Sequence, residues 1–130
     1  MAQLLLVPGA WHGAWCWRRL LPLLWQAGHH PHAVTLTGLG ERRRELTHAV
    51  TLQTHIDDVL AAVQAEEMES PVLVGHSYAG MVITGAADRL TADGPGRVAR
   101  LVYIDAIVPL PGETWSSTQD AATVAARVAA

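Results

Sequence analysis

A serine stands in the middle of the run Gly75–Gly80, which reads Gly-His-Ser-Tyr-Ala-Gly. A short apolar segment, Pro71–Val74, precedes the run, and an apolar pattern typical of a helix follows it, from about residue 78 to 90. A serine on so sharp a strand-to-helix turn has a strained backbone and a hydroxyl that stands clear of the sheet. The small residues Gly75, Ala79 and Gly80 let the strand and the helix approach each other. This pattern predicts that Ser77 is a nucleophile, with an ordinary helix N-cap as the alternative.

A second glycine-bearing turn, Pro8-Gly9-Ala10, follows another short apolar run, Gln3–Val7. The carboxyl ends of parallel strands meet at one rim of a sheet, and ligands of such sheets bind there. The helix that begins after Ser77 also offers free N–H groups and the positive end of its dipole to a developing oxyanion. We therefore expect both turns to contribute to one site.

Strand-like and helix-like segments alternate along the chain, which predicts βαβ units and a mainly parallel sheet. The fold class is α/β, a three-layer sandwich with helices on both faces of the sheet. Residues 1–108 are expected to form the sheet and its helices. The expected strands are Gln3–Val7, His32–Leu36, Pro71–Val74 and Val98–Ile104, and the expected helices are Gly13–Ala27 with a break at Pro22, Thr51–Glu67 and about 78–90.

Composition excludes several classes of partner. Half of the 130 residues are hydrophobic and the net charge is −3, so we expect one globular domain that binds neither nucleic acid nor membrane. The single cysteine, Cys16, rules out an internal disulfide and favours a cytoplasmic protein. Its place between Trp15 and Trp17 predicts a buried thiol. The scattered histidines give no metal-binding pattern, and no cofactor is expected.

Four motifs in this order resemble the N-terminal half of the α/β-hydrolase superfamily, in the group of plant methylesterases, hydroxynitrile lyases and related bacterial esterases. The resemblance covers residues 3 to about 117. It is carried by Val7-Pro8-Gly9-Ala10-Trp11-His12-Gly13-Ala14-Trp15-Cys16-Trp17, Leu36-Thr37-Gly38-Leu39-Gly40-Glu41-Arg42, Val72-Leu73-Val74-Gly75-His76-Ser77-Tyr78-Ala79-Gly80-Met81 and Leu101-Val102-Tyr103-Ile104-Asp105-Ala106.

The resemblance implies that Ser77 attacks a small carboxylic ester and forms an acyl-enzyme. It also implies that the backbone N–H groups of Ala10 and Tyr78 hold the oxyanion. Trp11 and Trp115 are candidates for the walls of the substrate pocket, with simple packing as the alternative. Residues 109–130 would then begin a cap region.

Departures from the family pattern separate the possible reactions. Pro8 stands where the family often has histidine, and Ala79 stands where it commonly has glycine. Gly9 resembles the esterases, because the lyases of the group carry threonine there; a lyase on the same fold remains the alternative activity. A dehalogenase would need aspartate in place of Ser77.

In this fold the catalytic acid and histidine follow the serine in the chain, yet no histidine follows His76. The resemblance therefore implies a truncated chain that lacks two members of the triad, and a catalytically incomplete fragment is a further alternative. Asp105 is an alternative acid, although a loop-capping carboxylate is the simpler interpretation. His12 and His76 are weaker candidates for the base. Truncation would leave the last strand as an exposed edge and favour self-association.

Overall fold

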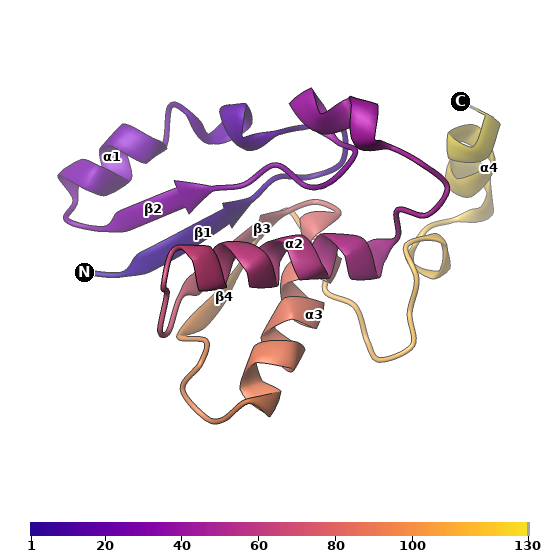
Figure 1. Cartoon of the computed structure of the whole chain (residues 1–130). Coiled ribbons are helices and arrows are strands. Elements are labelled where there is room, and N and C mark those ends of the chain that lie inside the picture. The colour runs from indigo at the N-terminus through magenta and orange to yellow at the C-terminus, as the bar shows by residue number, and fades with distance from the viewer. Residues whose placement is uncertain (130) are drawn as a thin grey trace.

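The computed structural model describes residues 1–129. Its centre is a sheet of four parallel strands, β1 (Gln3–Val7), β2 (His30–Ala33), β3 (Val72–His76) and β4 (Arg100–Ile104), in the order β2-β1-β3-β4 (Figure 1). The helices are α1 (Leu21–Gln26), α2 (Leu52–Ala65), α3 (Ala79–Ala92) and α4 (Ala121–Ala129), with 3-10 turns η1 (Ala14–Trp17), η2 (Gly40–Glu45) and η3 (Ser116–Thr118).

Two apolar layers join the sheet to helices on both of its faces, as the sequence predicted. On one face, Leu5 and Leu73 lie in a buried cluster with Val59 of α2 and Ile83 of α3. On the other face, side chains of β1 and β3 pack with η1 and α1 in a smaller cluster centred on Leu6, Trp17 and Val74. The alternation of these strand residues between the two clusters follows from the period of two in a strand. The architecture is that of a three-layer α/β sandwich.

The order of the strands creates a switch point beside β1. The chain passes from β1 to β2 on one side and then returns to place β3 on the other side. Loops that leave β1 and β3 therefore diverge, and a crevice opens between the carboxyl ends of these two strands. Ala10 and Ser77 follow these two strands, so the predicted site residues lie at this switch point.

Local sequence explains how α2 is placed beside that crevice. Thr51 caps its first turn: the Thr51 hydroxyl accepts from the N–H of Thr54, while the Thr54 hydroxyl accepts from the N–H of Thr51. This reciprocal capping satisfies two backbone donors at the start of the helix. The apolar stripe predicted for residues 51–67 faces the sheet, with Val59 and Val63 buried.

The break expected within Gly13–Ala27 is present: this stretch forms two separate pieces, η1 and α1, and Pro22 lies in the first turn of α1, where a helix accommodates proline. Two details of the prediction were wrong. The strand expected at His32–Leu36 lies earlier, at His30–Ala33, where its residues pair with Gln3–Leu6 of β1. Cys16 is exposed rather than buried, because the tight 3-10 turn sends Trp17 into the core instead.

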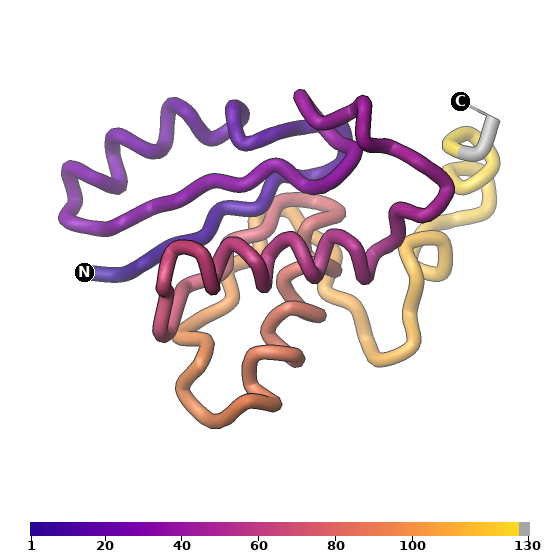
Figure 2. Tube along the Cα trace, in the orientation of Figure 1, coloured from indigo at the N-terminus to yellow at the C-terminus, as the bar shows by residue number. Residues whose placement is uncertain are grey.

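The chain beyond β4 runs out past the carboxyl ends of the strands to α4 (Figure 2). Strand β4 is the last strand of the sheet, and its side chains Val102 and Ile104 are 39% and 41% exposed. Within residues 1–129, no helix combines the length and the apolar character that crossing a bilayer requires.

Candidate active site

The turn between β3 and α3 holds Ser77 in a strained conformation. Its φ is +55°, in the left-handed region that non-glycine residues seldom adopt, and its side chain is exposed. The strand ends at His76 and the helix begins at Ala79, so the direction of the chain reverses within two residues. This is the strained, exposed serine that the sequence pattern predicted.

Glycines on both sides of Ser77 make the turn possible. A Cβ atom added to Gly75 would lie 2.8 Å from the carbonyl oxygen of Ala79 and 3.0 Å from Cδ1 of Ile83. A Cβ added to Gly80 would collide with the carbonyl of Ile107, in the segment after β4. Both positions therefore exclude a side chain, and β3, α3 and the segment after β4 approach one another closely around the serine.

The two residues predicted to donate to the oxyanion, Ala10 and Tyr78, line the same cavity as Ser77. Ala10 follows β1 and Tyr78 is the N-cap of α3. Neither N–H is a donor in any backbone hydrogen bond of residues 1–129. Unused donors beside a nucleophile are the arrangement that binds a developing oxyanion. Their role in an oxyanion hole stays a prediction.

The cavity has a volume of about 540 Å³ and brings together five parts of the fold. Its walls come from the loop after β1, the loop after β2, the N-terminal parts of α2 and α3, and the segment that ends in α4. The lining residues are Ala10, Trp11, His12, Leu39, His55, His76, Ser77, Tyr78, Trp115 and Arg127. Every candidate site residue from the sequence except Asp105 therefore lines this cavity, whereas Leu39, His55 and Arg127 were not predicted.

Aromatic side chains form much of this cavity. Trp11 has a φ of +71° and is 70% exposed, so it is held at the rim rather than in the core. The guanidinium carbon of Arg127 in α4 lies 6.0 Å from the centre of the Trp11 ring, within the range of a cation–π contact. Trp11 and Trp115 both line the cavity, and their role as walls of a substrate pocket stays a prediction.

The histidine His55 is the most informative lining residue that the sequence analysis missed. Its Nε2 lies 2.8 Å from the carbonyl oxygen of Thr37, and its Nδ1 lies 2.8 Å from the hydroxyl oxygen of Tyr78. Burial raises the pKa of Tyr78 to about 12. A signal was present in the sequence: residue 55 is one helical turn before Val59 and adjoins Ile56, so it belongs to the buried face of α2.

The predicted alternatives for the acid and the base have different positions. Asp105 follows β4, is exposed, has a φ of +44° and does not line the cavity of Ser77. His12 and His76 do line it, and their ring centres are 6.2 Å apart. Nδ1 of His12 lies 2.9 Å from the carbonyl oxygen of Ala10. No catalytic role of these three residues is tested by this geometry.

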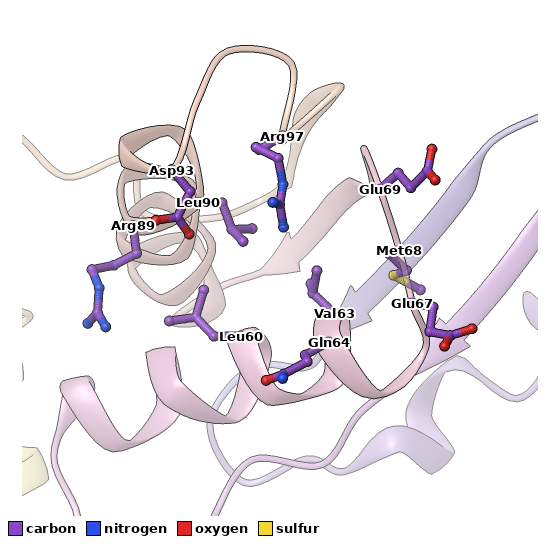
Figure 3. A pocket seen from close by; sticks show the side chains of 10 residues that line it. All are labelled: Leu60, Val63, Gln64, Glu67, Met68, Glu69, Arg89, Leu90, Asp93 and Arg97. Atoms are coloured by element: carbon purple, nitrogen blue, oxygen red, sulfur yellow. The ribbon is translucent and has the colours of Figure 1, made fainter.

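A larger cavity of about 900 Å³ lies elsewhere, between the C-terminal parts of α2 and α3 (Figure 3). Met68 and Glu69 precede β3, and Arg97 precedes β4, so this cavity is at the amino ends of the strands. No serine, histidine or cysteine lines it. In the part of the chain that the structure describes, no three His, Cys, Asp or Glu side chains are grouped to hold a metal ion. The cavity of Ser77 is therefore the better candidate for an active site.

The fold and the turn at Ser77 agree with a family assignment made from the sequence. A model described as the Alpha/beta hydrolase family matches residues 4–130, so the chain belongs to the α/β hydrolase family.

The chain is similar to esterases and to a lyase within this family. A carbendazim hydrolyzing esterase of Nocardioides sp. (strain SG-4G) is 49% identical over 114 residues, covering 88% of this chain and 46% of that protein. An alpha-hydroxynitrile lyase of Arabidopsis thaliana is 35% identical over 105 residues, covering 80% and 39%. The structure of an extracellular α/β-hydrolase from a Paenibacillus species superposes with a TM-score of 0.84 at 24% identity, covering 97% and 49%, which supports the fold. The chain spans less than half the length of these proteins.

Proposed function

We propose that this chain carries the nucleophile and the oxyanion hole of a serine esterase that acts on small, rather apolar carboxylic esters. The observation that carries the proposal is the φ of +55° at Ser77, on a turn that opens into a cavity of about 540 Å³. Backbone strain of this kind persists only where the surrounding structure imposes it, and it occurs frequently at active sites.

In the proposed reaction, Oγ of Ser77 attacks the carbonyl carbon of the ester while a base removes the hydroxyl proton. The carbonyl oxygen becomes an oxyanion, which the N–H groups of Ala10 and Tyr78 stabilise. The tetrahedral intermediate then collapses, the alcohol leaves with a proton, and the acyl group remains on Ser77. Water releases the acid by the same steps and regenerates the serine.

The mechanism also needs a base and an acid. A serine hydroxyl without a base is a poor nucleophile, and removal of a triad member leaves only the residual catalysis of the oxyanion hole and of binding. We infer that a histidine and an acid from sequence beyond residue 130 complete the site, with residues 109–130 as the beginning of the cap. Asp105 stays an alternative acid.

A lyase is the second candidate, since the Arabidopsis lyase is 35% identical to this chain. The glycine at position 9 favours the esterase, because the lyases that this chain resembles carry threonine there. We also propose a cytoplasmic location, from the single cysteine.

The test uses the chain and a chimera, in which the chain replaces the matched segment of the Nocardioides esterase. Both are assayed with p-nitrophenyl acetate, with carbendazim, for which that relative is named, and with mandelonitrile. Ester hydrolysis by the chimera that disappears in its Ser77→Ala variant supports the proposal. Release of cyanide without ester hydrolysis would favour the lyase. A folded chimera without either activity would leave the incomplete, non-catalytic chain as the correct description.

A further inference from the structure

His55 is a buried polar residue on the wall of the cavity. It lies on α2, and only 6% of its surface is exposed. Both of its ring nitrogens have a partner at 2.8 Å, the carbonyl oxygen of Thr37 on one side and the hydroxyl of Tyr78 on the other. Its ring also meets the ring of Tyr78 edge to face, with centres 5.7 Å apart and planes at 76°. A buried imidazole with both nitrogens paired is held in one orientation.

The partners determine where the proton lies on the neutral ring. A carbonyl oxygen only accepts hydrogen bonds, so Nε2 of His55 must carry the hydrogen and donate it to Thr37. Nδ1 of the neutral ring is then an acceptor, and the hydroxyl of Tyr78 donates to it. The direction of both hydrogen bonds follows from chemistry alone.

Hydrogen bonds to Asp58 and Arg42 hold Thr37, the partner of His55, in place. The N–H of Thr37 donates to Oδ2 of Asp58 at 2.7 Å, and its hydroxyl donates to Oδ1 of the same carboxylate at 2.8 Å. The guanidinium of Arg42 adds a hydrogen bond to the Thr37 hydroxyl at 3.2 Å. Hydrogen bonds to charged groups are stronger than neutral ones. The loop after β2, the helix α2 and the phenol of Tyr78 are therefore linked in one connected set.

Tyr78 is the residue directly after the nucleophile. Its backbone N–H and its phenol hydroxyl therefore have different roles. Tyr78 lines the cavity and its backbone N–H has no backbone acceptor among residues 1–129, while its phenol is hydrogen-bonded to His55. We propose that His55 is a positioning residue, which fixes the N–H of Tyr78 toward the oxyanion by holding the phenol. This inference rests on the proposed function and adds a residue to its machinery.

The kinetic test is made in the chimera with p-nitrophenyl acetate. His55→Leu removes the acceptor at similar volume, and Tyr78→Phe removes only the hydroxyl. Because the negative charge develops only as the ester is attacked and is absent from the bound substrate, we expect each variant to lower kcat about tenfold with little change in KM. This loss is smaller than that caused by removing an oxyanion donor itself. The two losses should not add in the double variant, because both remove the same hydrogen bond.

Two further variants separate positioning from simple packing. In His55→Asn the amide oxygen replaces Nδ1 as an acceptor for the phenol, and we expect it to recover most of the lost kcat. His48→Asn makes the same change at an exposed histidine outside the cavity and should leave kcat unchanged. Equal kcat in wild type, His55→Leu and Tyr78→Phe would overturn the positioning role alone. No turnover by the wild-type chimera would contradict the proposed function, and the positioning role would fall with it.

A spectroscopic measurement on the chain tests the hydrogen bond without any activity. The ¹⁵N shifts of His55 at neutral pH should show a hydrogen on Nε2 and a bare Nδ1, and Tyr78→Phe should change the Nδ1 shift. A hydrogen on Nδ1 with a bare Nε2 would overturn the inference, because the phenol would then be an acceptor and the bond to Thr37 would be lost.

Discussion

The α-carbon of Gly9 and the side chain of Ser77 lie in direct proximity across the two turns of the site. A Cβ atom at residue 9 would stand 3.1 Å from Cβ of Ser77, 3.1 Å from the carbonyl oxygen of His76 and 3.2 Å from its Nδ1. The loop after β1 thus limits the room available to the nucleophile, although the two residues are far apart in the sequence. Gly9 is a glycine for steric reasons.

The substitution Gly9→Ala is expected to displace Ser77 by a few tenths of an ångström. The rate of a reaction falls steeply when the reacting groups are displaced from their best geometry. We therefore expect the rate at which a fluorophosphonate labels the chimera to fall about tenfold. Gly28→Ala is the control: its φ is +87° and nothing lies near its added Cβ, so it should cost stability without a specific effect on labelling. An unchanged labelling rate in Gly9→Ala would contradict the steric explanation.

A second glycine pair tests the packing of α3. Gly80→Ala places a methyl group against the carbonyl of Ile107, which is backbone and cannot rotate away, and we expect a loss of about 1–3 kcal/mol in the free energy of unfolding. Gly85→Ala makes the same change in the same helix, but its methyl group meets only Cδ1 and Cγ1 of Ile56. Urea denaturation should show that Gly85→Ala lowers the free energy of unfolding less than Gly80→Ala does, or raises it. The opposite order would show that Ile107 does not pack as described.

The buried phenol of Tyr78 predicts a loss of stability at high pH. Its pKa is raised to about 12, so from about pH 10 upward the unfolded chain releases this proton while the folded chain keeps it. The stabilising contribution is complete below pH 10 and is lost as the pH rises through 12, by up to about 3 kcal/mol. Tyr78→Phe should show a shallower decline of the unfolding free energy between pH 9 and 11. Parallel declines in the two chains would exclude a buried phenol.

The exposed face of β4 predicts that the chain self-associates. Val102 and Ile104 are 39% and 41% exposed on an edge strand, and Val108 and Leu110 beyond it are 63% and 70% exposed. Unpaired edges and exposed apolar side chains favour contact between copies. Sedimentation velocity should show a concentration-dependent increase in mass, which the double variant Val102→Thr, Ile104→Thr reduces. A wild-type chain that stays monomeric across the concentration range would refute this expectation.

The sequence predicted local structure best where the local geometry tolerates few residue types. The first strand was predicted at its observed bounds, and the turn at Ser77 was predicted from its small neighbours, because strand–turn–helix geometry tolerates few residue types. The assembly of Ala10, Trp11 and Trp115 with Ser77 in one cavity also agrees with the expected site.

The features that the sequence did not reveal depend on contacts between distant parts of the chain. The environment of Cys16 depends on which of its neighbours reaches the core, and the bounds of the second strand depend on its pairing with β1. The partners of His55 come from residues 37 and 78, which only the fold brings together. For a histidine on the apolar face of a helix, the neighbouring sequence does not indicate which residues will be its hydrogen-bond partners.

The most direct test of the central claim is the identity of the residue that reacts with a fluorophosphonate. The chimera and the chain are labelled, digested and analysed by mass spectrometry, with Ser77→Ala as the control. We predict one modified peptide, with the label on Ser77, and no specific label in Ser77→Ala. Labelling of another residue, or equal labelling of the Ser77→Ala variant, would contradict the assignment of Ser77 as the nucleophile.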